Sequence, residues 1–335
     1  MKKISLIVLF TFLLSSFFGQ VKQNAPKQAT KEAPKTSQKK YQPANTQAAL
    51  VNKLLHDTCL DKKFSVVFYL IQDTTFNLLN TTNTPIIQAK LNSVITILNN
   101  AFSNICVSFE YCKLVVIPDY NYDKWKPFGN GQVAMNNYYM ENTLGIYLPN
   151  ELVPALPDVP ENNYAYTSTP ATPTTPPAIN GIVVQYIDVA KPNALGFKGE
   201  GLLHAMGHFF GLPHTYAEIN PGTAAAVTPQ PPTNVSTPIG TREFVNRINM
   251  QNCEEHGDGF CDTEADPYPS VATTQTFVSA TWNCSNTKGL KDGHGDFYLP
   301  PCDNLMSHYG LRCRFTQQQY NYMAYFILKN RMYLH

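Results

Sequence analysis

The chain has 335 residues, enough for one large domain or two small ones, and its 43% apolar and 12% aromatic residues are typical of a globular protein. Charged residues make up only 15% of the chain, and the formal net charge is +1. Since there is no surplus of basic residues, the composition does not predict binding to nucleic acid or to an anionic membrane.

The beginning of the chain is typical of a secretory signal peptide. Two lysines precede an apolar run over residues 4–18, and Gly19 offers a small residue for cleavage. The run, at about fifteen residues, is shorter than the ~20 needed to span a bilayer, which argues against a membrane anchor. We therefore expect a signal peptide over residues 1–19 and a secreted or periplasmic protein.

The segment after the signal predicts a linker or pro-segment. Residues 20–58 are rich in Lys, Gln, Pro, Ala and Thr and have few large apolar side chains, so they cannot bury enough surface to order themselves. We expect the folded domain over residues 59–335, with an N-terminal subdomain at 59–214 and a C-terminal subdomain at 215–335.

The first half of this domain alternates between strand and helix patterns. Thr84 and Pro85 predict an N-cap and a first helical position, and the apolar residues Ile87, Leu91, Val94, Ile95, Leu98 and Phe102 follow at helical spacing. β-Rich runs of strand length lie at 64–71, 107–117, 144–148 and 182–187. These patterns predict an α+β fold in which a long helix backs a twisted mixed sheet.

The second half shows less regular structure. Residues 149–177 contain many prolines and threonines and predict an extended surface loop. Residues 252–314 hold five cysteines and little periodicity, which indicates an irregular, disulfide-rich subdomain. Thr316 and Gln319 fit a capping box, and Tyr320, Met323 and Ile327 continue at helical spacing, so we expect a terminal helix.

The chain has eight cysteines, all after the signal segment, and an even number favours disulfides in an exported protein. No Cys-x-x-Cys pair occurs, which disfavours a cysteine zinc ribbon. Cys59 could block a metal site from a pro-segment, but the even count favours a plain disulfide partner. The connectivity is open, and the candidates for pairing are Cys106, Cys112, Cys253, Cys261, Cys284 and Cys313.

The pattern with the clearest chemistry is His204-Ala-Met-Gly-His208-Phe-Phe-Gly211-Leu-Pro-His214. Residues four apart lie on one face of a helix, so His204 and His208 can bind one ion together. Gly211 permits the left-handed turn that ends a helix, and His214 can then return as a third ligand. Single helix histidines are usually structural, but three in this pattern favour a metal. Three imidazoles with an open fourth position are typical of catalytic zinc.

The same segment resembles the metzincin signature, His-Glu-x-x-His-x-x-Gly-x-x-His followed by a Met-turn, and it is most similar to the pappalysin-like branch. Other stretches resemble that branch's first strand, substrate-side strand, cysteine-rich loop, Met-turn and its sequel, at residues 64–71, 163–166, 252–263, 303–307 and 313–316. The resemblance covers roughly residues 59–330. It implies a metzincin-type sheet, a zinc-binding active-site helix, Met306 in the Met-turn and polypeptide substrates.

Two departures fall on the catalytic positions that the resemblance implies. The general-base glutamate is Ala205, and the tyrosine after the Met-turn is His308, with Tyr309 one step further on. Glu200 lies about 140° round the helix from Ala205, so it points elsewhere. Losing a general base typically costs ~10²–10⁴ in rate, so we expect an impaired peptidase, either a natural pseudopeptidase or an engineered inactive variant.

Two other readings of the sequence stay open. The cleft could serve a non-catalytic module that binds peptides or proteins, or zinc could merely hold the core of a structural protein. The open fourth position argues against the structural protein.

The resemblance also implies a possible calcium site at Asp258 and Thr263, since oxygen donors suit that ion. The alternative is a loop stabilised by its own turn hydrogen bonds. The predicted partners are polypeptides, with no nucleic acid and no membrane anchor.

Overall fold

A computed structural model describes residues 59–72, 83–126, 129–153, 165–167, 181–185, 199–217, 243–245, 252–254, 256–266, 296–307, 309 and 312–335. The signal peptide and the linker predicted for residues 1–58 lie outside these residues. Cys284 and His308 lie outside them as well.

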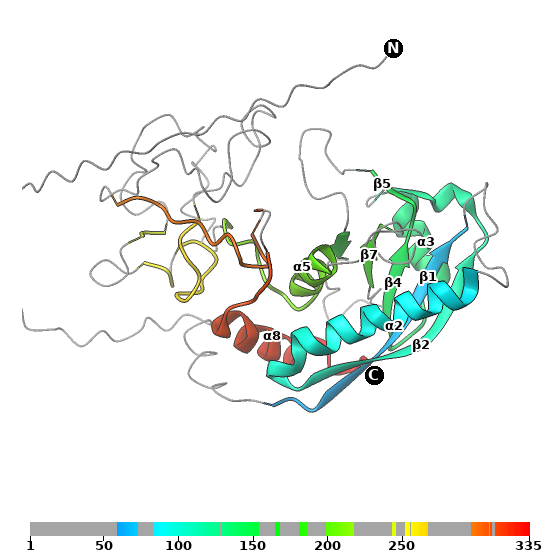
Figure 1. The fold of residues 1–335 in the computed structure, drawn as a ribbon, viewed down its shortest axis with the longest axis horizontal. Helices are drawn as coiled ribbons and strands as arrows, with labels where there is room; N and C mark the ends of the chain where they lie inside the picture. The colour runs from blue at the N-terminus through cyan, green and yellow to red at the C-terminus, as the bar shows by residue number, and fades with distance from the viewer. Residues whose placement is uncertain are drawn as a thin grey trace, which may run out of the picture. The chain divides into compact units, whose positions relative to one another are not determined.

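The described elements alternate between strands and helices along the chain (Figure 1). In chain order they are β1 (Lys62–Ile71), α2 (Asn83–Phe102), η1 (Ser103–Ile105), β2 (Val107–Ile117), η2 (Tyr120–Tyr122), β3 (Lys124–Trp125), α3 (Asn130–Tyr138), β4 (Leu144–Leu148), β5 (Glu151–Leu152), β6 (Ala165–Thr167), β7 (Gly181–Val184), α5 (Glu200–Phe209) and α8 (Gln317–Asn330). Among them, no helix combines the length and apolar character needed to cross a bilayer.

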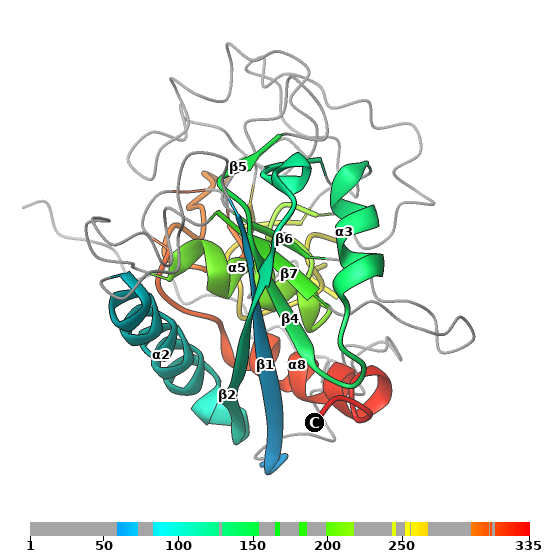
Figure 2. The same ribbon diagram turned by 90° about the vertical axis from the view of Figure 1, so that its right-hand side faces the viewer.

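The main sheet has the strand order β2-β1-β4-β7-β6 (Figure 2). Neighbouring strands from β2 to β7 are parallel, and β6 at the edge is antiparallel to β7. Parallel neighbours need crossover connections, and α2 supplies the one between β1 and β2. The sheet is therefore mixed, as expected. The sequence predicts the α+β class, in which helices and strands are segregated. In the described part helices and strands alternate, so the fold is a mixed α/β fold instead.

Hydrophobic side chains cover both faces of this sheet. On one face, alternate residues of β1 such as Phe64, Val66 and Phe68 form a single cluster with apolar residues of α2, α5 and α8. The other residues of β1, including Val67 and Tyr69, pack with Trp125 and with α3. Side chains of a strand point alternately to opposite faces, so one strand contributes to both cores. The histidine-bearing helix α5 is thus fixed against the sheet.

The predicted elements agree with the structure except at some boundaries. The six apolar α2 positions from Ile87 to Phe102 are all buried, as the helical spacing predicts. The helix begins at Asn83, two residues before the predicted first helical position at Pro85, so Thr84 and Pro85 both lie in its first turn. Strand β7 ends at Val184, short of the predicted 187. The short strands β5 and β6 interrupt the segment predicted as a loop over 149–177.

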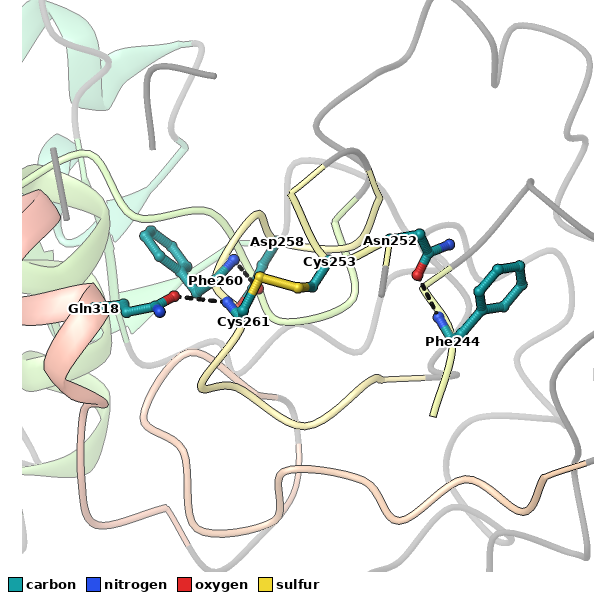
Figure 3. The surroundings of a disulfide bond; sticks show 7 residues. All are labelled: Phe244, Asn252, Cys253, Asp258, Phe260, Cys261 and Gln318. Atoms are coloured by element: carbon teal, nitrogen blue, oxygen red, sulfur yellow. Dashed lines mark hydrogen bonds between the residues drawn. A yellow bond between two sulfur atoms is a disulfide. The ribbon is translucent and has the colours of Figure 1, made fainter. Parts of the chain in front are cut away.

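The described residues between α5 and α8 form no helix or strand, which fits the predicted irregular subdomain. Cys253 and Cys261 form a disulfide in this region, and Cys302 is also disulfide-bonded. Figure 3 shows the Cys253–Cys261 bridge beside α8, where Gln318 Oε1 accepts the Cys261 N–H at 2.6 Å. The disulfide-bonded loop is thereby attached to the terminal helix.

Three cysteine assignments are decided by the structure. Cys59 pairs with Cys106, which confirms that Cys59 is a plain disulfide partner. The sequence indicates Cys112 and Cys313 as candidates for a disulfide. That prediction is wrong for both, because both are free and exposed. Cys112 has no partner in the β1–β2 register, where a bulge falls between Tyr111 and Lys113. A bulge leaves its extra residue outside the ladder, and Cys112 is that residue in β2.

Candidate metal centre

The first two histidines of the motif lie on α5. This helix ends just before Gly211, as the sequence predicts. His204 and His208 are four residues apart in this helix. Gly211 follows the C-cap with φ of +89°, a left-handed conformation that non-glycine residues rarely adopt. A Cβ at Gly211 would also overlap the Phe326 ring, since it would lie 2.7 Å from Cε2. The chain therefore reverses here and returns with His214.

The structure brings the three imidazoles together. The Nε2 atoms of His204 and His208 lie 3.1 Å apart, and those of His204 and His214 lie 3.2 Å apart. The third pair, His208 and His214, lies at 3.0 Å. The three Nε2 atoms therefore surround one point, although His204 and His214 lie ten residues apart in the sequence.

Backbone carbonyls determine which ring nitrogens carry the protons. His204 Nδ1 lies 2.7 Å from the Leu305 carbonyl oxygen, and His208 Nδ1 lies 2.8 Å from that of Leu212. A carbonyl can only accept, so each Nδ1 donates its proton and the neutral ring presents a lone pair at Nε2. Burial lowers the pKa of His208, against a smaller opposite effect of the Leu212 carbonyl, and so favours the neutral ring.

Two Nε2 lone pairs that face each other at 3.1 Å repel unless a cation lies between them. Tetrahedral zinc with Zn–N bonds of about 2.05 Å would separate its nitrogens by about 3.3 Å, close to the spacing found here. Among the described residues, these histidines are the only group of three or more His, Cys, Asp or Glu side chains that could hold a metal ion. The donor set therefore fits a metal ion with a fourth position left open.

Two further contacts hold the third histidine. The Tyr216 ring stacks on that of His214 with the centroids 4.8 Å apart and the planes at 13°. The next residue, Thr215, donates its N–H to the Met306 carbonyl at 3.2 Å. The segment that carries His214 is thus joined to the turn at Met306.

Met306 lies beneath the helix at Gly207, between the two helical histidines. It is fully buried, and a Cβ at Gly207 would overlap its sulfur and lie 3.1 Å from Phe315 Cε1. Met306 occupies a turn in which the Ser307 N–H donates to the Asn304 carbonyl at 3.1 Å. Glycine at 207 therefore lets the helix approach closely the turn that contains Met306.

Ala205, where the resemblance implies a general base, lies among apolar side chains. Ala205 has no exposed surface and belongs to the same hydrophobic cluster as α2 and the sheet. Glu200 interacts electrostatically with Arg312. Burial lowers the pKa of Arg312, and the charge of Glu200 has a smaller, opposite effect on it. In the described part of the chain, no carboxylate joins the three imidazoles as a further member of their group. Among the described residues, no carboxylate therefore takes the place of the glutamate that the resemblance implies at position 205.

A network that the sequence did not indicate lies beside His214, the third histidine. Asp266 accepts from the Thr215 hydroxyl at 2.5 Å and from the Tyr309 hydroxyl at 2.9 Å. Tyr309 is 3% exposed, so its hydroxyl is engaged with Asp266 in the protein interior. His308, where the resemblance implies a tyrosine, lies outside the described residues. The only sequence signal for this network is the position of Thr215 directly after His214.

The loop expected to bind calcium is compact. Asp258 and Thr263 are 2% and 1% exposed. Asp258 Oδ1 accepts the Phe260 N–H at 3.0 Å, and the Thr263 N–H donates to the Phe260 carbonyl at 3.1 Å. These turn hydrogen bonds match the alternative of a self-stabilised loop, and calcium here stays a prediction.

No protein-family model matches the sequence, and no curated protein matches it. Among solved structures, the chain is similar to a mutant of Tannerella forsythia promirolysin, with 15% identity, 86% of this chain and 88% of that one covered, and a TM-score of 0.47. Mature mirolysin from the same organism, in complex with a cleaved peptide, has 14% identity, coverage of 80% and 90%, and a TM-score of 0.40. Archaemetzincin from Methanopyrus kandleri has 13% identity, coverage of 45% and 76%, and a TM-score of 0.29.

All three TM-scores lie below 0.5, so the site geometry, and not these likenesses, carries the argument. The fold and the site define a mixed α/β protein with a preformed three-histidine group that could hold a metal ion.

Proposed function

We propose that this chain is a secreted, pappalysin-like zinc metalloendopeptidase of the metzincin type, with hydrolysis impaired by Ala205. The observation that carries the proposal is the convergence of three Nε2 atoms within 3.0–3.2 Å, two of them with the tautomer set by carbonyls. Imidazole ligands at an open three-histidine site suit zinc among the common metals.

In this proposal the protein supplies ligands and a polypeptide-binding edge. His204, His208 and His214 would hold the ion, and zinc would supply Lewis acidity towards water and a peptide carbonyl. The Leu305 and Leu212 carbonyls keep two of the rings oriented, which usually strengthens metal binding.

The edge of the sheet supports a polypeptide as the substrate or ligand. Strand β6 is the last strand in the sheet order, is antiparallel to β7 and contacts α5. An extended peptide can add to such an edge through main-chain hydrogen bonds. A peptide bound there would pass beside the helix that carries His204 and His208.

Export is also part of the proposal. The segment at residues 1–19 would direct the chain out of the cytoplasm. The Cys59–Cys106 and Cys253–Cys261 disulfides support an oxidising compartment.

A second function, a non-catalytic module that binds polypeptides at the same edge of the sheet, is favoured by the burial of Ala205. A methyl group with no exposed surface can neither accept a proton nor orient water. The three histidines would then stabilise the binding site without supporting hydrolysis.

Substitution at position 205 tests these two functions against each other. Ala205→Glu should restore a base next to His204 and raise peptide hydrolysis by ~10²-fold or more, in a manner that a zinc chelator abolishes. Ala205→Gln is the matched control, because it has the same size without a basic carboxylate. Adding His308→Tyr should raise the rate further, since an oxyanion donor is worth ~10²–10³.

Zinc content and folding are measured for each variant, since a carboxylate at a buried position can destabilise the protein. A folded, zinc-loaded Ala205→Glu protein that stays inert would favour the binding module. Efficient cleavage by the unmodified chain would show that another acid serves as base. A chain that binds no zinc would overturn both functions.

A further inference from the structure

The C-terminal end of α5 has carbonyl groups that the helix itself cannot satisfy. Three of the last four carbonyls accept hydrogen bonds from backbone N–H groups. Phe210 donates to the Met206 carbonyl, Leu212 to that of Gly207 and Gly211 to that of His208. The last two bonds form the pattern of a Schellman motif. The fourth carbonyl, that of Phe209, accepts from Arg331 instead, at 3.4 Å from Nε and 3.3 Å from Nη2.

Arg331 is buried at this helix end and comes directly after α8. It is 1% exposed, and its guanidinium carbon lies 4.3 Å from the centroid of the Phe209 ring. Its Nη1 also lies 3.5 Å from the Tyr333 hydroxyl. A cation at a helix C-terminus is favourable because the partial charge there is negative. One side chain thus joins the end of α8 to the end of the metal-binding helix.

The same part of α8 supports the chain reversal between the second and third histidines. The Phe326 ring fills the space that a Cβ at Gly211 would need. Arg331 and Phe326 therefore contact consecutive parts of the turn, at the Phe209 carbonyl and at Gly211. Three residues after Gly211 the chain reaches His214.

We propose that Arg331 is a positioning residue of the metal site, which holds the turn so that His214 meets the two helical histidines. This inference rests on the proposed zinc binding. Arg331 itself is not a ligand, so its loss should keep all three imidazoles in the protein. The position of His214 relative to His208 should become less well fixed. Loss of such a supporting contact typically weakens metal binding by about 10–100-fold.

The test compares zinc affinities of full-length variants by competition with a chelator, at a temperature where all of them are folded. Arg331→Met removes the donors and keeps an apolar stem, and we expect zinc affinity to fall by about 10–100-fold. Arg331→Lys keeps the charge and a single donor nitrogen without the planar fork, so we expect a smaller loss. Tyr320→Phe is the matched control, because it removes a hydrogen bond of 2.7 Å from α8 to the Ala101 carbonyl at the end of α2.

A His214→Ala background separates positioning from general stabilisation. If Arg331 acts by placing His214, Arg331→Met should cause no further loss of zinc affinity once His214 is absent. An equal loss in both backgrounds, or a loss in Tyr320→Phe as large as in Arg331→Met, would overturn the inference.

Unchanged affinity in Arg331→Met would overturn it too, while zinc binding by the parent would still support the proposed function. If Arg331→Met does not fold, the comparison rests on Arg331→Lys, with the same criteria. Absence of zinc from the parent protein would overturn the proposed function and this inference together.

Discussion

The side-chain amides of Asn304 and Gln319 bond to each other in both directions. Asn304 Nδ2 donates to Gln319 Oε1 at 3.0 Å, and Gln319 Nε2 donates to Asn304 Oδ1 at 3.3 Å. Asn304 Oδ1 also accepts the Met306 N–H, and Gln319 Oε1 accepts the Thr316 N–H. The capping box that begins α8 therefore also holds the turn that contains Met306.

Gln319→Leu should destabilise the protein strongly. It leaves the Thr316 N–H and the Asn304 amide without these partners in the interior, and each such group costs about 1–3 kcal/mol. We expect urea unfolding to show a loss of at least about 2 kcal/mol. Gln132→Leu is the control, since the Gln132 bond to Asn136 is exposed, and it should change stability little. Equal effects of the two variants would contradict the role of the amide pair.

Gly207→Ala should destabilise the protein although alanine is the better helix former. Helix propensity favours alanine by about 1 kcal/mol, whereas overpacking against Met306 costs about 1–3 kcal/mol. The added methyl should also push the helix from the turn and weaken zinc binding. In a Met306→Ala background the cost of the alanine should shrink, as thermal unfolding would reveal. A more stable Gly207→Ala protein would show that the contact is not tight.

Each of the three histidines should be required for zinc. We expect about one zinc per chain in the parent and a clear loss in His204→Ala, His208→Ala and His214→Ala. His335→Ala is the control, because this histidine is exposed at the C-terminus. Elemental analysis after gel filtration measures the content. Retention of zinc in all three ligand variants would place the metal elsewhere.

Acid should destabilise the metal-free protein through His208. Burial lowers the pKa of this imidazole below its usual value of about 6.5, so the unfolded chain binds the proton more readily than the folded one. Stability should therefore fall as the pH drops below about 6.5. Urea unfolding between neutral and mildly acidic pH should show a smaller fall in His208→Gln than in the parent. His335→Gln should behave like the parent, and a parallel fall in all three proteins would exclude His208 as the cause.

Several features follow from local patterns that the sequence contains. The apolar spacing from Ile87 to Phe102 predicts the buried face of α2, because helical periodicity depends only on neighbouring residues. Thr316 and Gln319 predict the start of α8 for the same reason, and the capping box is present. The spacing of His204, His208 and His214 likewise indicates a metal site without knowledge of the fold.

Other features depend on residues distant in sequence, and only the tertiary structure decides them. Cys59 pairs with Cys106 because β1 and β2 lie side by side, whereas Cys112, at a bulge in β2, is a free cysteine. The Leu305 carbonyl orients His204 from a position 101 residues away, and Arg331 completes a helix end 122 residues away. No periodicity or local motif encodes such contacts, since they arise only when the packed core brings the segments together.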